Sequence, residues 1–163
     1  MPATYDKIEA RTLGSASTSV TFSTIPATYT DIVIVAAGTI SSGAPSTYIR
    51  LNGDTGSNYS HTYLTGDGSS ATSSRASSQT SMLVTYNGAI AASPNTNILQ
   101  VMNYANTTTN KTVLSRANQA QYGTDAVVGL WRSTAAINSI TFITGGTGFA
   151  IGSTFTLYGI KAA

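Results

Sequence analysis

Cysteine is absent from this chain of 163 residues, and its 41% hydrophobic content is accompanied by very little charge. The absence of cysteine excludes disulfide bonds, zinc sites built on thiolates and cysteine nucleophiles. Lys, Arg, Asp and Glu make up only 9% of the residues, compared with about 25% in typical soluble domains. The polar surface must therefore consist mainly of Ser, Thr, Asn and Gly. Its weak electrostatic self-repulsion favours association with copies of itself or with a partner.

Long basic or hydrophobic runs are missing as well. The net charge of +2 comes from scattered Lys and Arg residues, so no basic stripe exists and no nucleic-acid partner is expected. The longest hydrophobic run, Ile32 to Ala37, is far shorter than the roughly 20 residues that span a bilayer. No signal peptide is recognisable at the N-terminus. We therefore expect a soluble protein, made in the cytoplasm, with no membrane partner.

The chain is instead rich in short β-type segments. Apolar and polar residues alternate in them, and no segment has sustained helical periodicity. Turn residues recur at the spacing expected for a sandwich or barrel. We expect a single all-β domain over residues 1–163, an antiparallel, jelly-roll-like β-sandwich of about ten short strands. The expected strands are Tyr5–Leu13, Ser17–Ser23, Ile32–Val35, Thr47–Leu51, Tyr59–Leu64, Ser81–Tyr86, Asn97–Tyr104, Thr112–Ala120, Val127–Arg132, Ile137–Thr144 and Ser153–Ile160.

The last third of the chain holds three of these strands. The glycine-rich break at 145–148 marks a turn between two of them. Three consecutive strands are the least that forms a stable sheet, so a three-stranded meander is expected from Gly129 to Ile160. Trp131 falls on the face opposite its core and is expected to contact a neighbouring subunit. The candidates for the core face are Val128, Leu130, Phe155 and Leu157.

Two turn-rich segments carry further predictions. Asn52-Gly53 lies between two expected strands and is a strong signal for a hairpin that joins them. The segment from Thr65 to Thr80 has no apolar side chain larger than alanine, a composition typical of flexible linkers. It leaves two interpretations open, a mobile loop or an arm ordered by a partner subunit. Arg75, the only positive charge in the segment, is the natural anchor of such an arm.

Groups that could support catalysis are few. The only histidine, His61, lies on an expected strand, and no serine lies in a G-x-S-x-G motif. A Ser-His-Asp triad can draw its partners from anywhere in a chain, so His61 is the one catalytic candidate, although a packing role is the preferred interpretation. One histidine without cysteine does not supply a typical zinc site. We expect no enzymatic activity and no cofactor.

Two weaker ligand hypotheses stay open. Asn52, Asp54 and Asp67 lie in expected loops and carry oxygen ligands suited to calcium, but turn chemistry explains Asn and Asp beside Gly equally well. Nine tyrosines could provide apolar platforms for a sugar, although strand tyrosines more often pack in a core.

Apolar residues on both faces of the expected strand Asn97–Tyr104 suggest a second surface that is buried on assembly. Leu99 and Val101 share one face, whereas Met102 and Tyr104 share the other. The candidate residues for contact with another subunit or with a larger assembly are Arg75, Met102, Tyr104, Trp131 and Arg132.

Four segments have distinctive sequences: Thr12–Val35, Ile49–Leu64, Asn103–Arg116 and Gly129–Ile160. The last is the most specific, since it combines a Trp-Arg dipeptide, an Ile-Asn-Ser-Ile strand and a closing GSTFTLYGI. Together they resemble a family of small virion proteins that is common among phages of cyanobacteria and other aquatic bacteria. The Thr65–Thr80 segment is not part of the resemblance, which carries over no catalytic or ligand residue.

The resemblance implies a jelly-roll or related β-sandwich on a phage particle that assembles in the host cytoplasm. A capsid cement or decoration protein, expected as a homotrimer, would bind the major capsid protein on the virion surface and stabilise the head. A tail-associated or fibre-tip protein would instead bind a host surface glycan. The lack of a coiled-coil or collagen-like repeat favours the cement role. The expected partners are then the major capsid protein and further copies of this chain.

Overall fold

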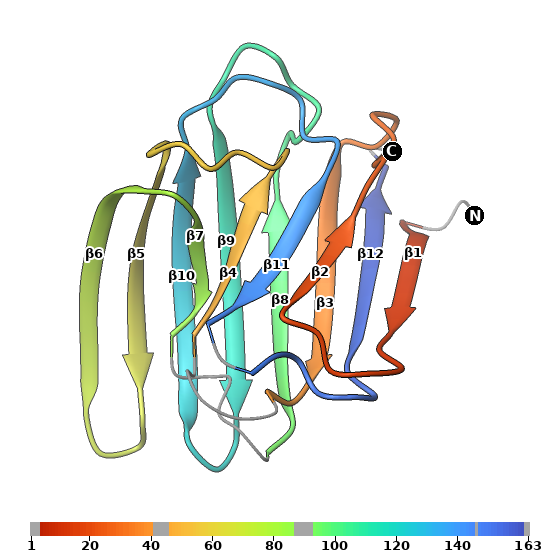
Figure 1. Ribbon diagram of the computed structural model, residues 1–163. Helices are drawn as coiled ribbons and strands as arrows, with labels where there is room; N and C mark the ends of the chain where they lie inside the picture. Colours follow the sequence, from red (N-terminus) through yellow and green to blue (C-terminus); the bar gives the residue numbers. More distant parts are fainter. Residues whose placement is uncertain (1–3, 41–45, 87–92, 146, 162–163) are drawn as a thin grey trace.

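The computed structural model describes residues 4–40, 46–86, 93–145 and 147–161 (Figure 1). These residues form twelve strands in two sheets and no helix, which confirms the prediction of an all-β, jelly-roll-like sandwich. No helix that could cross a membrane occurs in the described ranges. The strands are β1 (Tyr5–Thr12), β2 (Ser19–Phe22), β3 (Asp31–Gly38), β4 (Thr47–Leu51), β5 (Tyr59–Gly66), β6 (Ala71–Gln79), β7 (Met82–Thr85), β8 (Asn95–Val101), β9 (Lys111–Gln119), β10 (Gly123–Trp131), β11 (Ile140–Thr144) and β12 (Thr154–Ile160).

The two sheets differ in size. The large sheet has the order β1-β12-β3-β8-β9-β10-β5-β6, and the small sheet has the order β2-β11-β4-β7. Figure 1 shows the small sheet packed over one face of the large sheet, with β6 at the left beyond its cover. We call the opposite face of the large sheet, which points away from the small sheet, the outer face.

The core lies between the two sheets. In most strands alternate side chains point into it, as in β2, where Val20 and Phe22 are 4% and 0% exposed. Phe142 of the small sheet meets Phe155 of the large sheet edge to face, with ring centroids 5.4 Å apart. Phe155 and Leu157 are buried, which confirms their predicted place in the core.

The expected meander is wrong, although its three strands exist. β10 and β12 belong to the large sheet, whereas β11 pairs with β2 and β4 in the small sheet. The connections between these strands therefore cross from one sheet to the other. The inner face of β12 then packs against β11, where Phe155 meets Phe142, and the inner face of β10 packs against β7. Gly146 of the expected glycine turn lies outside the described residues.

The turn at Asn52-Gly53 forms, but the predicted hairpin is wrong. Asn52 and Gly53 have φ values of 52° and 67°, and the amide of Asp54 donates to the carbonyl of Leu51 at 3.0 Å. β4 before the turn lies in the small sheet, and β5 after it lies in the large sheet. The residues at 55–58 supply the length for this crossing, which a two-residue hairpin turn could not span.

The prediction that Thr65 to Thr80 is a loop or arm is also wrong. β5 continues into this segment, a turn follows at Asp67-Gly68, and β6 covers Ala71–Gln79. The Asp67 side chain accepts two backbone hydrogen bonds across the turn. An edge strand is held by backbone hydrogen bonds to its neighbour and needs no large apolar side chain. Composition alone therefore did not indicate it.

Candidate functional site

The outer face of the large sheet carries the clearest candidate site. Along β5, β9 and β10, alternate side chains point to the core and to this face. The strand register places Val128 of β10 beside Leu114 of β9 and Thr62 of β5. In the next row of the same face, Ala126 lies beside Leu64. The outward side chains of the three strands therefore form one surface.

Leu64, Leu114 and Val128 form an apolar patch on this surface. Their exposed fractions are 55%, 43% and 43%. Side chains directly or diagonally opposite on neighbouring strands lie about 5–8 Å apart, so the three are contiguous. The solvent side of an antiparallel sheet is normally polar. Contiguous exposed apolar side chains with a polar rim are typical of an interaction site.

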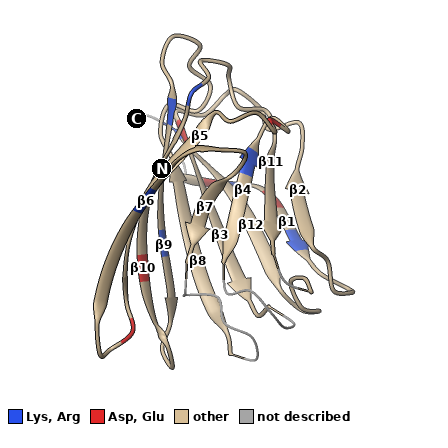
Figure 2. Cartoon of the chain, turned by 60° about the vertical axis from the view of Figure 1, so that its left-hand side comes forward, with Lys and Arg blue, Asp and Glu red and all other residues tan. Residues whose placement is uncertain are grey.

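Three arginines surround the apolar patch: Arg75 on β6, Arg116 on β9 and Arg132 just after β10. Arg132 Nη2 donates to Ser60 Oγ at 3.1 Å. The ion pairs found among the described residues both lie at the opposite edge of the sheet, next to β1. On the outer face of β5, β6, β9 and β10 there is no acidic side chain. Figure 2 shows how sparse the charged residues are over the whole chain.

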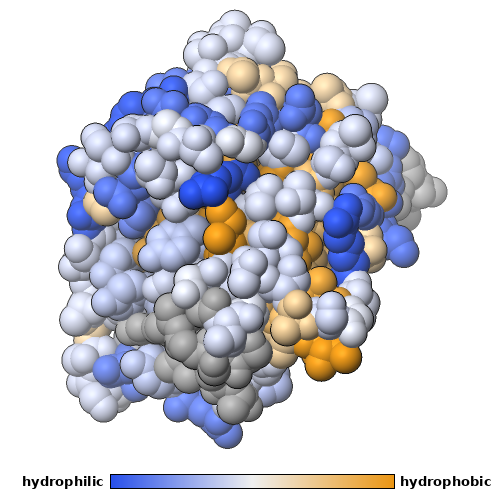
Figure 3. Space-filling view, viewed as in Figure 1, coloured by the Kyte–Doolittle hydropathy of each residue, from blue (hydrophilic) through white to orange (hydrophobic). Residues whose placement is uncertain are grey.

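Two shallow, open hollows cover this surface. One is lined by the apolar patch together with Thr62 and Ala126, and the other by Leu130, Arg75 and Arg132. Both hollows are too open to surround a small molecule, so the surface suits a broad macromolecular partner better. Figure 3 shows the opposite side of the molecule, where polar groups cover most of the surface and hydrophobic ones lie between them.

The predicted contact residues fall into two groups, of which one is exposed at the surface and the other is buried in the core. Arg75 and Arg132 are exposed at the rim of the apolar patch, and Met102 is 46% exposed after the end of β8. The prediction is wrong for Tyr104, which is fully buried. β8 has ended before this residue, and Asn103 has a φ of 53°, so the chain turns and the Tyr104 ring enters the core instead of continuing the alternation.

The prediction is also wrong for Trp131, which is only 3% exposed and belongs to the core. Val128 and Leu130, expected in the core, point outward. Both alternating sets of β10 contain apolar residues, so periodicity could not distinguish them. Gly129 shows why this orientation is adopted: a Cβ there would lie 2.1 Å from Met82 Sδ. Because β7 lies so close, β10 must turn towards it the face that carries Gly129, and Val128 and Leu130 then point outward.

Trp131 anchors a partly buried polar cluster at one end of the sandwich. Its Nε1 donates to Asp54 Oδ2 at 2.6 Å, and this hydrogen bond lowers the pKa of Asp54. The indole stacks on Tyr59, with ring centroids 6.4 Å apart. The Tyr59 hydroxyl accepts a hydrogen bond from the Leu51 amide at 3.0 Å, and burial raises the pKa of Tyr59 to about 12. The cluster joins β4, β5 and β10 and is structural.

His61 links the two sheets. Its Nδ1 accepts a hydrogen bond from the Leu83 amide at 3.3 Å, and burial lowers the pKa of the imidazole. The neutral ring is the form that can accept this bond. The geometry therefore assigns His61 a packing and positioning role in the core.

The three calcium candidates do not come together. Asp54 precedes β5 and Asp67 follows it, so they lie at opposite ends of an eight-residue strand. Asn52 uses its side chain to bond the backbone of the segment before β11. No group of three or more His, Cys, Asp or Glu side chains that could hold a metal occurs in the part of the chain that the structure describes.

A third hollow, lined mainly by polar residues, lies where the β5–β6 turn meets the β9–β10 turn. Tyr122 is 40% exposed there, and Asp67, Asn118 and Gln121 also line the hollow. An exposed aromatic ring beside amide and carboxylate groups can bind a sugar, because the ring offers an apolar platform and the polar groups pair with hydroxyls.

The contact residues predicted from the sequence did not include the members of the apolar patch or Tyr122. The available signal for the apolar patch is the presence of consecutive apolar residues in single strands, as in Val113-Leu114 and Val127-Val128. One member of each pair must point away from the core.

Comparisons with known proteins bear on the fold. No family model matches the chain, and no curated protein matches its sequence. Exo-inulinase from Aspergillus awamori aligns over 96% of this chain with a TM-score of 0.50 and 14% identity, and the chain spans 29% of the length of that protein. Galectin LEC-6 from Caenorhabditis elegans aligns over 90% of this chain and 94% of its own, with a TM-score of 0.39 and 10% identity. The exo-inulinase likeness shows a related β-sandwich fold alone.

Proposed function

We propose that this protein is a structural component of a phage virion, a capsid cement or decoration protein that binds the major capsid protein shell. The observation that carries the proposal is the apolar patch of Leu64, Leu114 and Val128 on the outer face. Burying these side chains against a partner would recover roughly 25 cal/mol for each Å² of apolar area removed from water. A surface of this kind supports a protein-binding role.

The charge of the outer face narrows the kind of partner. Arg75, Arg116 and Arg132 surround the apolar patch. The outer face of β5, β6, β9 and β10 carries no acidic side chain. The matching surface would have an apolar centre and carboxylates at its rim, because rim charges of opposite sign select the partner and its orientation. Repetition of this contact over a shell compensates for a modest affinity at each site.

The choice of a phage shell as partner rests on the sequence resemblance to small phage virion proteins. The scarcity of charge supports it, since a nearly neutral surface packs in many copies with little repulsion. In this role the protein would add contact area across subunits of the major capsid protein and help the head to resist the pressure of the packaged DNA.

Co-sedimentation with empty heads assembled without this protein tests the proposal. Leu114→Ser and Val128→Ser together should reduce binding at least tenfold, because they remove the centre of the apolar patch. Ile151→Ser is the matched control, since Ile151 is 70% exposed and outside the patch, and it should bind like the unchanged protein. Equal binding of the double variant would contradict the proposal, provided that its melting temperature is unchanged.

A second candidate function is supported by the hollow at Tyr122. A tail-associated or fibre-tip protein would use this ring and the neighbouring Asp67, Asn118 and Gln121 to bind a host surface glycan. A glycan array with the purified protein distinguishes the two functions. Saturable binding that Tyr122→Ala abolishes would favour the tail role, and no binding at any glycan would remove it.

A further inference from the structure

β6 is the most exposed strand of the large sheet. Every residue of Ala71–Gln79 except Ala76 is exposed. β6 pairs with β5 on one side, and no strand in the described ranges pairs with its other side. Figure 1 shows β6 at the left edge, beyond the small sheet. One row of backbone N–H and C=O groups is therefore free to pair with another strand.

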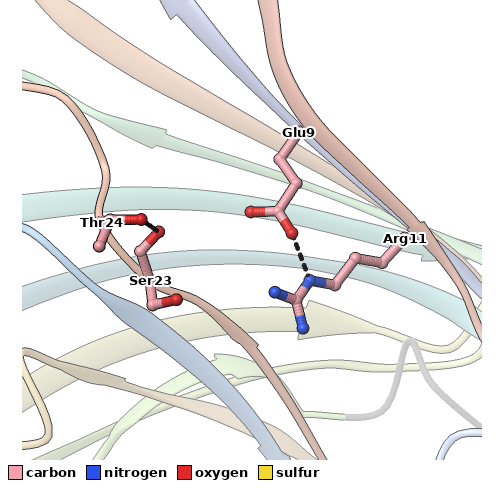
Figure 4. Close-up of polar contacts among 4 residues, drawn as sticks. All are labelled: Glu9, Arg11, Ser23 and Thr24. Carbon is pink, nitrogen blue, oxygen red and sulfur yellow. Dashed lines mark hydrogen bonds and ion pairs between the residues drawn. The ribbon is translucent and has the colours of Figure 1, made fainter.

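The other edge of the same sheet is protected. β1 carries charges of both signs, and Arg11 Nε donates to Glu9 Oε1 at 2.6 Å (Figure 4). Asp6 pairs with Lys161 at 2.7 Å. The register with β12 shifts between Lys7 and Glu9, which marks a bulge. Charges and bulges are the devices by which proteins prevent pairing at a sheet edge.

β6 lacks most of this protection. Its residues are Ala, Ser, Thr and Gln apart from Arg75, and it contains no proline. A bulge is present only near its end, where the register with β5 shifts and Ser78 has a φ of 55°. The part in regular register, Ala71–Ala76, is an edge of six residues whose side chains are small except that of Arg75.

We propose that β6 pairs with β6 of a second copy of this chain, in antiparallel orientation, and joins two large sheets into one. Apart from Arg75, the side chains of Ala71–Ala76 are too small to form a pocket that would select the side chains of a foreign peptide. Recognition must come from the backbone, and an identical strand matches it in length and hydrogen-bonding pattern. A contact of one strand with itself is isologous and closes as a two-fold dimer.

The geometry of such a dimer follows from strand pairing. The two-fold axis stands normal to the sheet, so residues opposite each other share a face. An axis at Ser73 or Ser74 lies at the centre of Ala71–Ala76 and keeps the two Arg75 side chains from lying directly opposite each other. Both outer faces then lie on the same side of the joined sheet, and two apolar patches face one direction. This inference goes beyond the proposed function and does not depend on it.

Cysteine cross-linking of the purified full chain tests the pairing. The chain has no cysteine, so one introduced thiol can form a disulfide only between copies. Ser73→Cys and Ser74→Cys are the test variants, and Ala10→Cys on the exposed side of β1 is the control. Under mild oxidation, we expect one of the β6 variants to form a covalent dimer severalfold faster than the control. Cross-linking of both β6 variants no faster than the control would overturn the inference.

Sedimentation of the unmodified chain provides the second measurement. The expected result is a monomer–dimer equilibrium that Thr72→Lys with Ser74→Lys weakens at least tenfold, because charges of one sign then meet across the pairing edge. Thr12→Lys on β1 should leave the equilibrium unchanged. A chain that is monomeric at every concentration, a dimer that the lysines do not weaken, or a trimer without β6 cross-links would each refute the pairing. These measurements use no capsid, so their failure is separate from failure of capsid binding.

Discussion

The side chain of Trp131 shows how one residue can fix the end of a sandwich. It fills the core beside Tyr59 and donates a hydrogen bond to the carboxylate of Asp54 at 2.6 Å. Both functions depend on β10 presenting the face that carries Gly129 to β7. Sequence periodicity could not predict this, because Val127 and Val128 are equally suited to a core. The choice is made by a close approach between strands of different sheets, which only the folded chain defines.

Replacement of Trp131 by Phe separates the two functions of the indole. The ring stays apolar, but the N–H donor to Asp54 is lost. A hydrogen bond to a partly exposed charged group contributes about 1–2 kcal/mol. Phenylalanine is also smaller than the buried indole, so we expect Trp131→Phe to lower the free energy of unfolding by at least that amount in urea denaturation. Trp131→Ala should cost about 3–5 kcal/mol because it also leaves a cavity. Equal stability of the Phe variant and the unchanged protein would show that the bond contributes nothing.

The lowered pKa of His61 predicts how the stability of the fold depends on pH. Burial lowers its pKa below 6.5 in the folded protein, so the unfolded chain binds the proton first as the pH falls. The stabilising contribution of the neutral ring is fully present above pH 6.5 and is lost below it, by at most about 1.4 kcal/mol per pH unit.

His61→Gln keeps an acceptor for the Leu83 amide but does not titrate. Between about pH 7.5 and about pH 5, the free energy of unfolding of the unchanged protein should fall relative to that of the variant. His61 is the only histidine of the chain, so little else titrates in this range. Parallel pH profiles of the two proteins would contradict the assignment.

Single strands were easier to predict than their partners. The alternation in Ser17–Ser23 and the β-branched run Ile32–Val35 correspond to β2 and β3, because local side-chain patterns reflect burial on one or both faces. The Asn52-Gly53 turn was also predictable from its left-handed residues. Its role as a crossing between sheets was not, since the pairing of β4 with β11 joins residues far apart in the chain. β6 had no side-chain signal at all.

The crossing turn is held by the side chain of Asn52 as well as by its backbone. Asn52 Nδ2 donates to the Ala136 carbonyl at 2.8 Å, and Oδ1 accepts from the Asn138 and Ser139 amides at 2.9 and 3.2 Å. Asn52→Gly keeps the left-handed backbone but loses these bonds, so it should cost about 2–3 kcal/mol.

Asn52→Ala should cost about 1 kcal/mol more than Asn52→Gly, because alanine is strained at a positive φ. Chemical denaturation of both variants measures the two contributions separately. A glycine variant as stable as the unchanged protein would show that the side chain does not hold the crossing.

At the scale of the whole molecule, the fold class followed from the sequence and the candidate binding surface did not. Short alternating segments without helical periodicity indicate an all-β sandwich or barrel. The apolar patch exists only because β9, β10 and β5 are neighbours, although β5 is separated from the other two by three intervening strands in the chain. Its residues are individually unremarkable in sequence, and their register brings them together.

A cryo-EM reconstruction of purified virions that contain this protein tests the central claim most directly. The account predicts many copies on the head, with the outer face of the large sheet and the apolar patch of Leu64, Leu114 and Val128 against the major capsid protein. Density for the chain only at the tail, or a head-bound sandwich whose small sheet faces the shell, would contradict it.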